Sequence, residues 1–179
     1  MRADAEQNRE RILEVARVAL KASSAASLQS IAKAAGVGQG TLYRHFPTRE
    51  ALLLAVYRHD VSELIDAAPK LLAEHAPAEA LRLWFERLAA YGRIKHGVGE
   101  AVEAATRADL SSEFYAPTCA AITLLLDAGK QAGTLRPDVD AGDILQLVGF
   151  LWRTDFGADR EARTAHLLTL VLDGLKPQS

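Results

Sequence analysis

The sequence predicts an all-α protein of about nine helices. Apolar residues recur at helical spacings along most of the chain, as in the stripe formed by Leu81, Trp84, Leu88 and Tyr91. Runs of Val, Ile and Thr with period-two alternation are few, so we expect no strands. Uninterrupted apolar runs stay short, such as ALLLAVY at 51–57, whereas a membrane span needs roughly 20 residues. We therefore expect helices that pack on one another and none that crosses a bilayer.

The composition is that of an ordinary globular protein. The chain has 179 residues, of which 49% are hydrophobic and 25% are charged. This length allows one or two small domains with a sizeable core. The first ten residues are polar and do not resemble a signal peptide. The single cysteine, Cys119, excludes an internal disulfide. Together these features predict a cytoplasmic protein.

The charge is distributed unevenly along the chain. The net charge is −2, but residues 1–60 hold nine Lys or Arg against six Asp or Glu, whereas residues 61–179 hold twelve against seventeen. A mildly basic N-terminal part therefore precedes an acidic body. The net charge alone argues against a general coating of nucleic acid, and the asymmetry is weak evidence by itself, because differences of this size often arise by chance.

Three helices and the start of a fourth are predicted in the N-terminal part. The first spans 7–22. Ser27 is a suitable N-cap for a short second helix, and Gly36 suits the left-handed turn at its end. A third helix follows through GQGTLYRH. Thr48 can cap the next helix, which is expected to end or kink at Pro69.

The remaining chain predicts a succession of further helices. Pro77 can start one of them, and the glycines of KHGVGE are expected to loosen or break the helix after it. Gly133 is a helix stop, and Asp140 and Asp159 are N-caps. The helices expected after this break are 100–108, 112–132, 141–156 and 160–174.

The stretch GVGQGTLYRHF, from Gly36 to Phe46, first suggests a phosphate-binding loop. A dinucleotide-binding loop requires a strand followed by G-x-G-x-x-G and a helix. Gly36 and Gly38 occupy the first two positions, but Thr41 occupies the third, and the preceding residues are predicted to be helical. The Gly-Lys-Ser/Thr of a Walker-type loop is missing as well. A nucleotide site is therefore disfavoured.

A helix-turn-helix accounts better for the same residues. This motif requires a short helix, a tight turn and a second helix that enters the major groove of DNA by its N-terminus. Ala32 and Ala35 are small enough to let the two helices approach closely, and Gly36 can make the turn. Three apolar side chains are expected to anchor the second helix, namely Val37, Leu42 and Phe46.

The outward side chains of this second helix suit a DNA-facing surface. Gln39 can pair with an adenine edge, and Thr41 can reach a base or a phosphate. Gly40 permits close approach to the DNA backbone, and Tyr43 and His45 can donate to phosphate oxygens. The full set predicted on this helix is Gln39, Gly40, Thr41, Tyr43, Arg44 and His45.

Three residues outside that helix complete the predicted DNA surface. Ser27 marks the N-terminus of the preceding helix, whose backbone amides can bind a phosphate. Gln29 lies in the first turn of the same helix and can reach the groove. Arg49 begins the following helix and can clamp a phosphate. Packing is the alternative role for Tyr43, and a side chain lying along its own helix is the alternative for Arg44.

At this point the chain resembles the TetR/AcrR-type transcriptional regulators. The resemblance rests on RERILEVARVAL and on IAKAAGVGQGTLYRHFPTREALL, and it is strong over residues 8–58. It implies that Gln29, Gln39, Thr41, Tyr43, His45 and Arg49 fall at DNA-contacting positions. Two departures are the stretch KASSAAS, where the family often has a glycine and an aromatic residue, and Gly38, where it usually has a serine that caps the helix.

The resemblance also implies a two-domain organisation. Residues 1–50 are expected to form the DNA-binding domain, and residues 51–179 a helical effector-binding and dimerisation domain, with the boundary inside a long helix. In such proteins a small effector typically releases the DNA-reading heads from the operator. Six residues are candidates for an apolar pocket with polar handles, and simple core packing is the alternative for each of them: Trp84, Tyr91, Phe114, Tyr115, Cys119 and Trp152.

The last two predicted helices carry more apolar residues than one core stripe needs. The segments DILQLVGFLWR and HLLTLVLDGL are apolar on more than one face. This excess predicts a two-fold dimer with a four-helix interface. The candidate interface residues are Leu145, Val148, Leu151, Leu167 and Val171.

No enzyme signature occurs in the acidic part. G-x-S-x-G, H-E-x-x-H and C-x-x-C are all missing. His96 and Glu100 have an i, i+4 spacing that could bind a metal, but a solvated helix face is the favoured interpretation, so we expect no metal and no cofactor. The leading hypothesis is a homodimeric repressor that binds double-stranded DNA and responds to a small molecule. The alternatives are a ligand-independent regulator or activator, or a helical enzyme or scaffold.

Overall fold

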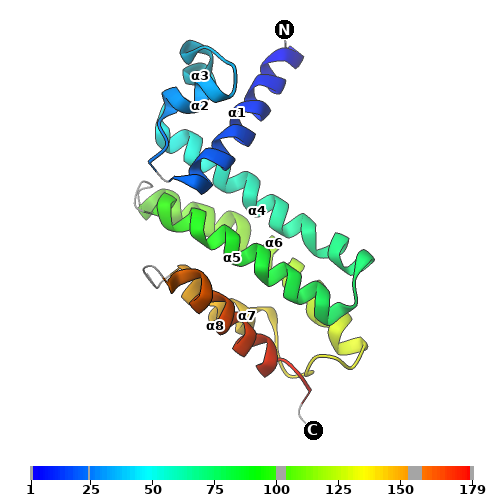
Figure 1. Ribbon diagram of the computed structural model, residues 1–179. Helices are drawn as coiled ribbons and strands as arrows, with labels where there is room; N and C mark the ends of the chain where they lie inside the picture. Colours follow the sequence, from blue (N-terminus) through cyan, green and yellow to red (C-terminus); the bar gives the residue numbers. More distant parts are fainter. Residues whose placement is uncertain (1, 24, 100–103, 153–158, 178–179) are drawn as a thin grey trace. The chain divides into compact units, whose positions relative to one another are not determined.

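The protein is helical throughout the part that the structure describes (Figure 1). The structure is a computed structural model that describes residues 2–23, 25–99, 104–152 and 159–177, without the side chains of 2–3, 21, 91–99, 104–112, 152 and 160. Over these ranges no strand occurs, so the all-α prediction is confirmed. The elements are α1 (Arg2–Ala22), α2 (Leu28–Ala34), α3 (Gln39–His45), α4 (Arg49–Glu74), α5 (Pro77–Gly99), α6 (Ala104–Gln131), α7 (Ala141–Leu147), the 3-10 helix η1 (Val148–Trp152) and α8 (Arg160–Gly174).

The chain divides into two units, and helix α4 belongs to both. Unit 1 comprises Met1–Asp60 and Ile94–Ala104, and unit 2 comprises Val61–Arg93 and Ala105–Ser179. The division therefore falls inside α4. The domain limits at residues 50 and 51 stay a prediction from the sequence.

Unit 1 is built on a small apolar core shared by α1, α2, α3 and the start of α4. Helix α1 contacts α2 and α3, and α2 contacts α3 (Figure 1). Each of the four helices contributes buried side chains, among them Ile12, Ile31, Leu42 and Leu52. Because burying such a side chain contributes about 1.5–3 kcal/mol, this cluster fixes α3 against α1 and α2.

Unit 2 has its own buried core, in which a tryptophan links α4 to α5. Trp84 is fully buried, and its indole Nε1 donates a 2.8 Å hydrogen bond to the carbonyl oxygen of Leu64. Helix α6 adds the buried side chains of Ile122 and Leu125. The polar atom of the largest buried side chain is thus satisfied inside the core.

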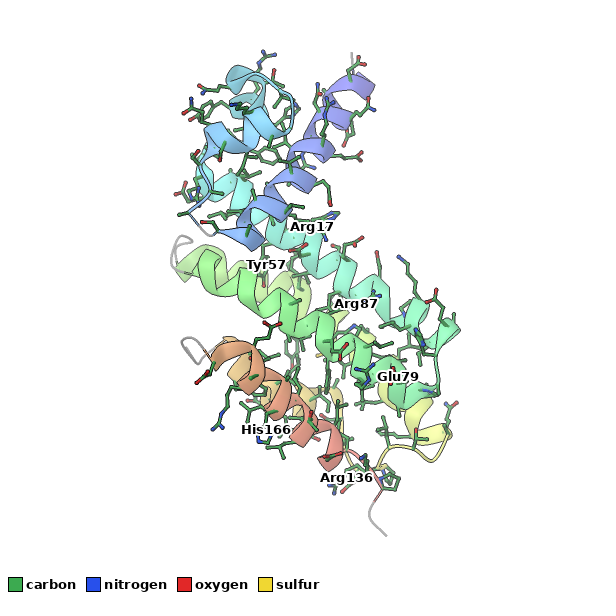
Figure 2. All side chains as sticks on the ribbon, viewed as in Figure 1. Arg17, Tyr57, Glu79, Arg87, Arg136 and His166 are labelled. Atoms are coloured by element: carbon green, nitrogen blue, oxygen red, sulfur yellow. The ribbon has the colours of Figure 1, made fainter. Side chains whose placement is uncertain are left out.

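The end of α6 is closed by a tight turn whose loop is tied to α8. Gly133 has a φ of 66°, and the amides of Thr134 and Leu135 donate to the carbonyl oxygen of Gly129 at 2.9 and 3.2 Å. The next residue, Arg136, donates from its amide to the carbonyl oxygen of Leu175 at 2.9 Å, beside the end of α8 (Figure 2). The loop that follows α6 is therefore anchored at both ends.

Three helices run past limits that the sequence pattern predicts, because the backbone tolerates residues that the pattern disfavours. Helix α6 is continuous from Ala104, although two helices at 100–108 and 112–132 were expected; no glycine or proline between 104 and 116 interrupts it. Helix α5 passes through Gly97 to Gly99, since an interior glycine costs only about 1 kcal/mol relative to alanine. Helix α4 continues beyond Pro69 to Glu74, so it does not end at the proline, whereas the predicted alternative of a kink stays a prediction.

Two further expectations concern the last helices. Asp140 caps α7 as predicted, with its side chain accepting from the amide of Asp143 and the reverse bond completing a capping box. The predicted helix 141–156 changes to 3-10 geometry at Val148, and residues 153–158 lie outside the described part. Asp159 is the N-cap residue of α8 as predicted, although its side chain makes no capping hydrogen bond.

Candidate nucleic-acid interface

The two short helices α2 and α3 are joined by a turn whose local bonds follow the sequence. Ser27 accepts a 3.1 Å hydrogen bond from the amide of Ser30 and so caps α2. Gly36 adopts a φ of 65°, and the amide of Val37 then donates to the carbonyl oxygen of Ala32 at 3.0 Å. This is the bonding of a Schellman turn. Gly38 is the N-cap of α3 and has no side chain to cap it.

Apolar residues hold α3 by its inner face. Leu42 and Phe46 are buried, Val37 is partly buried, and all three pack in the core of unit 1. Ile31, from α2, is buried in the same cluster. The predicted inward-facing residues of the motif are therefore confirmed.

The opposite face of α3 is polar and open. Gln39, Gly40 and Arg44 are exposed, and Tyr43 is 49% exposed. Thr41 and His45 are partly buried. From α2, Ser27 and Gln29 are exposed as well. A Cβ added at Gly40 would meet no heavy atom within 4 Å, so packing inside the chain does not require glycine there.

The two predicted arginines of this surface are engaged by carbonyl oxygens of the chain itself. Arg44 donates from Nε to the carbonyl oxygen of Gly40 at 3.2 Å, so its side chain lies along α3. Arg49 donates from Nη1 to the carbonyl oxygen of Ala26. This bond ties the start of α4 to the segment that immediately precedes the capping residue Ser27. Arg49 is therefore placed to hold α2, which its position in the sequence does not indicate.

An arginine that the sequence analysis did not single out lies at the end of α3. The Cζ atom of Arg9, from α1, is 5.6 Å from the centroid of the Phe46 ring. No local spacing relates residue 9 to residue 46, so this contact required the fold.

A charged cluster joins α1 to α4 within unit 1. Arg17 Nε lies 2.9 Å from Oδ1 of the buried Asp60, and Arg17 Nη1 lies 3.2 Å from Glu14 Oε2 (Figure 2). His59 Nε2 is also 3.2 Å from Arg17 Nη1. An ion pair that is mostly buried must keep both partners, because removing one leaves an uncompensated charge.

Comparison with known proteins identifies the family. A model described as bacterial regulatory proteins of the tetR family matches residues 12–56, and a model described as the C-terminal domain of SbtR-like transcriptional regulators matches residues 76–177. The crystal structure of the TetR transcriptional regulator SCO0520 from Streptomyces coelicolor is 41% identical, with a TM-score of 0.82, and the alignment covers 96% of this chain and 99% of that one. The chain belongs to the TetR family of transcriptional regulators.

Other TetR-family proteins support the assignment over different shares of the chain. The crystal structure of the TetR transcription regulatory protein from Mycobacterium vanbaalenii is 32% identical, with a TM-score of 0.73 over 98% of this chain and 99% of that one. The HTH-type transcriptional repressor LfrR of Mycolicibacterium smegmatis is 44% identical over 63 residues, which are 35% of this chain and 33% of LfrR. The HTH-type transcriptional regulator SAB2452 of Staphylococcus aureus is 33% identical over 91 residues, 49% of each chain. The matches thus span a third to a half of these curated relatives.

Unit 2 of this TetR-family chain contains a cavity of about 580 Å³. Its apolar lining includes Phe85, Leu135, Leu168 and Leu172, so it lies between α5, the loop after α6 and α8. This volume is within the range of about 300–1,000 Å³ that is usual for small-molecule sites. The whole lining comprises Ala76, Ala78, Glu79, Arg82, Phe85, Glu86, Thr134, Leu135, Ala165, Leu168, Thr169, Leu172, Asp173 and Lys176.

Ion pairs line the polar side of this cavity. Arg82 holds Glu79 in a bidentate pair, with N–O distances of 2.6 and 2.8 Å, and also bonds Glu86. The hydrogen bonds from Arg82 lower the pKa of the Glu79 carboxyl. Lys176 pairs with Asp173 at 2.7 Å. Each charged group of the lining therefore has an opposite partner beside it.

Four of the six residues predicted for an effector pocket are absent from the lining of this cavity, namely Trp84, Phe114, Tyr115 and Cys119. Trp84 is buried and bonded to Leu64, while its neighbour Phe85 lines the cavity instead. Phe114 and Cys119 are partly buried. Tyr115 is exposed, and its hydrogen bond with Cys119 raises the pKa of its hydroxyl. The side chains of Tyr91 and Trp152 lie outside the described residues, as do those of His96 and Glu100.

Two of the predicted dimer residues are covered within one chain. Val148 and Leu151 are buried in the protomer, because they follow α7 into the packed 3-10 helix. The expectation that these two form an outward interface is therefore corrected. Leu145, Leu167 and Val171 are partly buried. The large exposed apolar side chains on α7 and α8 are Leu147 and Leu170, which are 50% and 53% exposed.

The described residues contain neither a candidate membrane span nor a candidate metal site. No described helix is long and apolar enough to span a bilayer. Within the same residues, no group of three or more His, Cys, Asp or Glu side chains is arranged to hold a metal ion.

Proposed function

We propose that this TetR-family chain is a cytoplasmic, homodimeric repressor that binds an operator in double-stranded DNA and leaves it when a small molecule binds. The DNA-binding part of this proposal is supported by helix α3, which packs against the core of unit 1 by one face. Its inner face is fixed by Leu42 and Phe46, whereas Gln39, Gly40 and Tyr43 are presented outward. Such a helix suits insertion into the major groove. The name of LfrR, a transcriptional repressor, supports the choice of repression over activation.

The DNA-binding proposal is tested with duplexes from upstream of the gene that encodes the protein. We expect tight, sequence-specific binding that weakens steeply as salt increases, because phosphate contacts release counterions. Gel shifts with specific and scrambled duplexes measure both properties. Binding that never exceeds that of scrambled DNA would refute an operator of this kind, and the transcription of a reporter with and without the protein separates a repressor from an activator.

The cavity of unit 2 supports the effector part of the proposal. Its apolar floor and the carboxylates and hydroxyls around it suit a small apolar molecule that carries hydrogen-bond donors. We expect such compounds to raise the melting temperature and to weaken DNA binding, because a ligand shifts a conformational equilibrium only by binding one state better. Ala165→Trp places a bulky ring in the cavity and is expected to abolish both effects. A ligand-independent regulator would show no such coupled response.

The remaining apolar surface of α7 and α8 supports the homodimer. We expect a dimer in solution by light scattering, and we expect Leu170→Glu to shift it towards the monomer, because the charge would be buried in the interface. Val18→Glu is the matched control, since Val18 is an exposed apolar residue of α1 in unit 1. A wild-type monomer at micromolar concentration would contradict the dimer.

A further inference from the structure

The contact between Arg9 and Phe46 places a cation beside the C-terminal end of α3. The distance of 5.6 Å from Arg9 Cζ to the ring centroid is within the range of a cation–π contact. Phe46 is the C-cap of α3 and is 2% exposed. The buried ring is therefore a fixed platform, and it holds the guanidinium at the C-terminal end of α3.

Arg9 differs from Arg17, Arg44 and Arg49 of unit 1 in what it contacts. Arg17 pairs with carboxylates, and Arg44 and Arg49 donate to carbonyl oxygens. Arg9 is exposed, and among the described residues its contact is the ring of Phe46, with no ion pair or hydrogen bond. An aromatic face attracts the charge but accepts none of the guanidinium hydrogens in the plane of the group. The donors of Arg9 are therefore available to a partner.

The length of α3 indicates what that partner is. A helix of seven residues is about 10 Å long at 1.5 Å per residue, and the major groove is about 12 Å wide and 8.5 Å deep. When α3 enters the groove by its N-terminus, its C-terminal end is left near the rim of the groove. The rim is formed by backbone phosphates, which arginine binds with paired, charge-assisted hydrogen bonds.

We propose that Arg9 is a phosphate-contacting residue of the DNA interface, held on the ring of Phe46 so that its guanidinium meets a backbone phosphate beside the major groove. The inference rests on the proposed function, because it requires that α3 binds duplex DNA. A phosphate contact contributes affinity and salt dependence but no sequence preference. Arg9 therefore strengthens binding to every duplex by the same factor.

The test compares the full-length wild type with three variants on a fluorescent duplex of random sequence. Fluorescence anisotropy gives the binding constant between about 50 and 200 mM KCl, where phosphate contacts change it most visibly. We expect Arg9→Gln to reduce the slope of log K against log[KCl] by about 0.9 for each bound chain, whereas Arg9→Lys keeps the slope because it keeps the charge. Arg11→Gln is the matched control, since Arg11 is on the same helix and bonds to Asn8; we expect its slope to equal that of the wild type.

A second measurement separates DNA binding from packing. If Arg9 only packs on Phe46, Arg9→Gln lowers the melting temperature and leaves the salt slope unchanged, and that result overturns the proposal. A wild type that binds no duplex overturns the proposed function, and the assignment of Arg9 with it. A wild type that binds with a steep slope, together with an unchanged slope for Arg9→Gln, overturns the assignment of Arg9 alone.

Discussion

At the scale of the residue, Tyr43 combines exposure with a position on the anchored helix. Its side chain is half exposed on α3, next to the buried Leu42. We expect Tyr43→Ala to weaken DNA binding by about 1–2 kcal/mol, roughly tenfold, through the loss of a hydrogen bond to a charged phosphate. The melting temperature should stay within a few degrees of the wild type. Parallel binding titrations and thermal melts check this, and a collapse of stability would mean that the side chain packs in the core.

Arg49 allows a test of two roles that the sequence alone does not distinguish. It was predicted to clamp a phosphate, but its guanidinium donates to the carbonyl oxygen of Ala26. We expect Arg49→Ala to reduce the stability of unit 1 by about 1–3 kcal/mol, because a partly buried carbonyl loses a charged donor. Arg49→Gln is expected to reduce stability less, because glutamine keeps a hydrogen-bond donor on a shorter side chain.

The outcome for Arg49 is decided by two measurements on the same samples. Denaturant unfolding monitors stability, and the salt slope of DNA binding counts phosphate contacts. Lost stability with an unchanged slope fits a residue that positions α2. A reduced salt slope with unchanged stability would instead show that Arg49 binds a phosphate, as the sequence predicted.

At the scale of the element, the sequence predicts features that depend on near neighbours along the chain. Ser27, Gly36 and Asp140 were identified as caps or turns from their residue types, and the structure confirms them. The inward face of α3 followed from spacing alone. These features are local because a cap or a turn is completed by bonds within four or five residues.

Contacts between distant residues could not be predicted in this way. The bond from Arg49 to Ala26 and the contact between Arg9 and Phe46 depend on how whole helices pack. The cavity of unit 2 is another example, because aromatic residues at helical spacing fit a core as well as a pocket. Trp84 proved to belong to the core, whereas the cavity lining includes charged residues such as Arg82.

Gly129 illustrates such a non-local requirement inside a helix. A Cβ on Gly129 would lie 2.3 Å from Leu135 Cδ1, and Leu135 is a buried residue of the cavity lining. We expect Gly129→Ala to destabilise the protein by about 1–3 kcal/mol through overpacking, although alanine is the better helix former. Gly40→Ala is the control, because it has open space: it should keep or raise the melting temperature while it weakens DNA binding.

At the scale of the whole molecule, the proposed function depends on how charge is distributed along the chain and on the symmetry of the proposed dimer. The first 60 residues carry an excess of basic side chains and the rest an excess of acidic ones. A protein organised in this way is attracted to phosphates by one part only, so binding is oriented rather than a general coating. In the proposed complex each chain inserts one short helix into the groove, which limits how many base pairs a single copy can read.

The proposed dimer therefore predicts a large effect of a substitution outside the DNA-binding unit. Leu170 lies on α8 in unit 2, and Leu170→Glu leaves every residue of α1 to α3 unchanged. Linking two heads raises the affinity for a two-part operator by about 10²–10⁴ through effective concentration, so a monomeric variant should lose at least about a hundredfold. On a duplex with a single half-site, the same variant should bind as the wild-type head does. Binding constants on the two duplexes test this expectation, with Val18→Glu as the control variant. If a variant that is shown to be monomeric binds the full operator as tightly as the wild type does, one DNA-binding unit is sufficient and the dimer is not required.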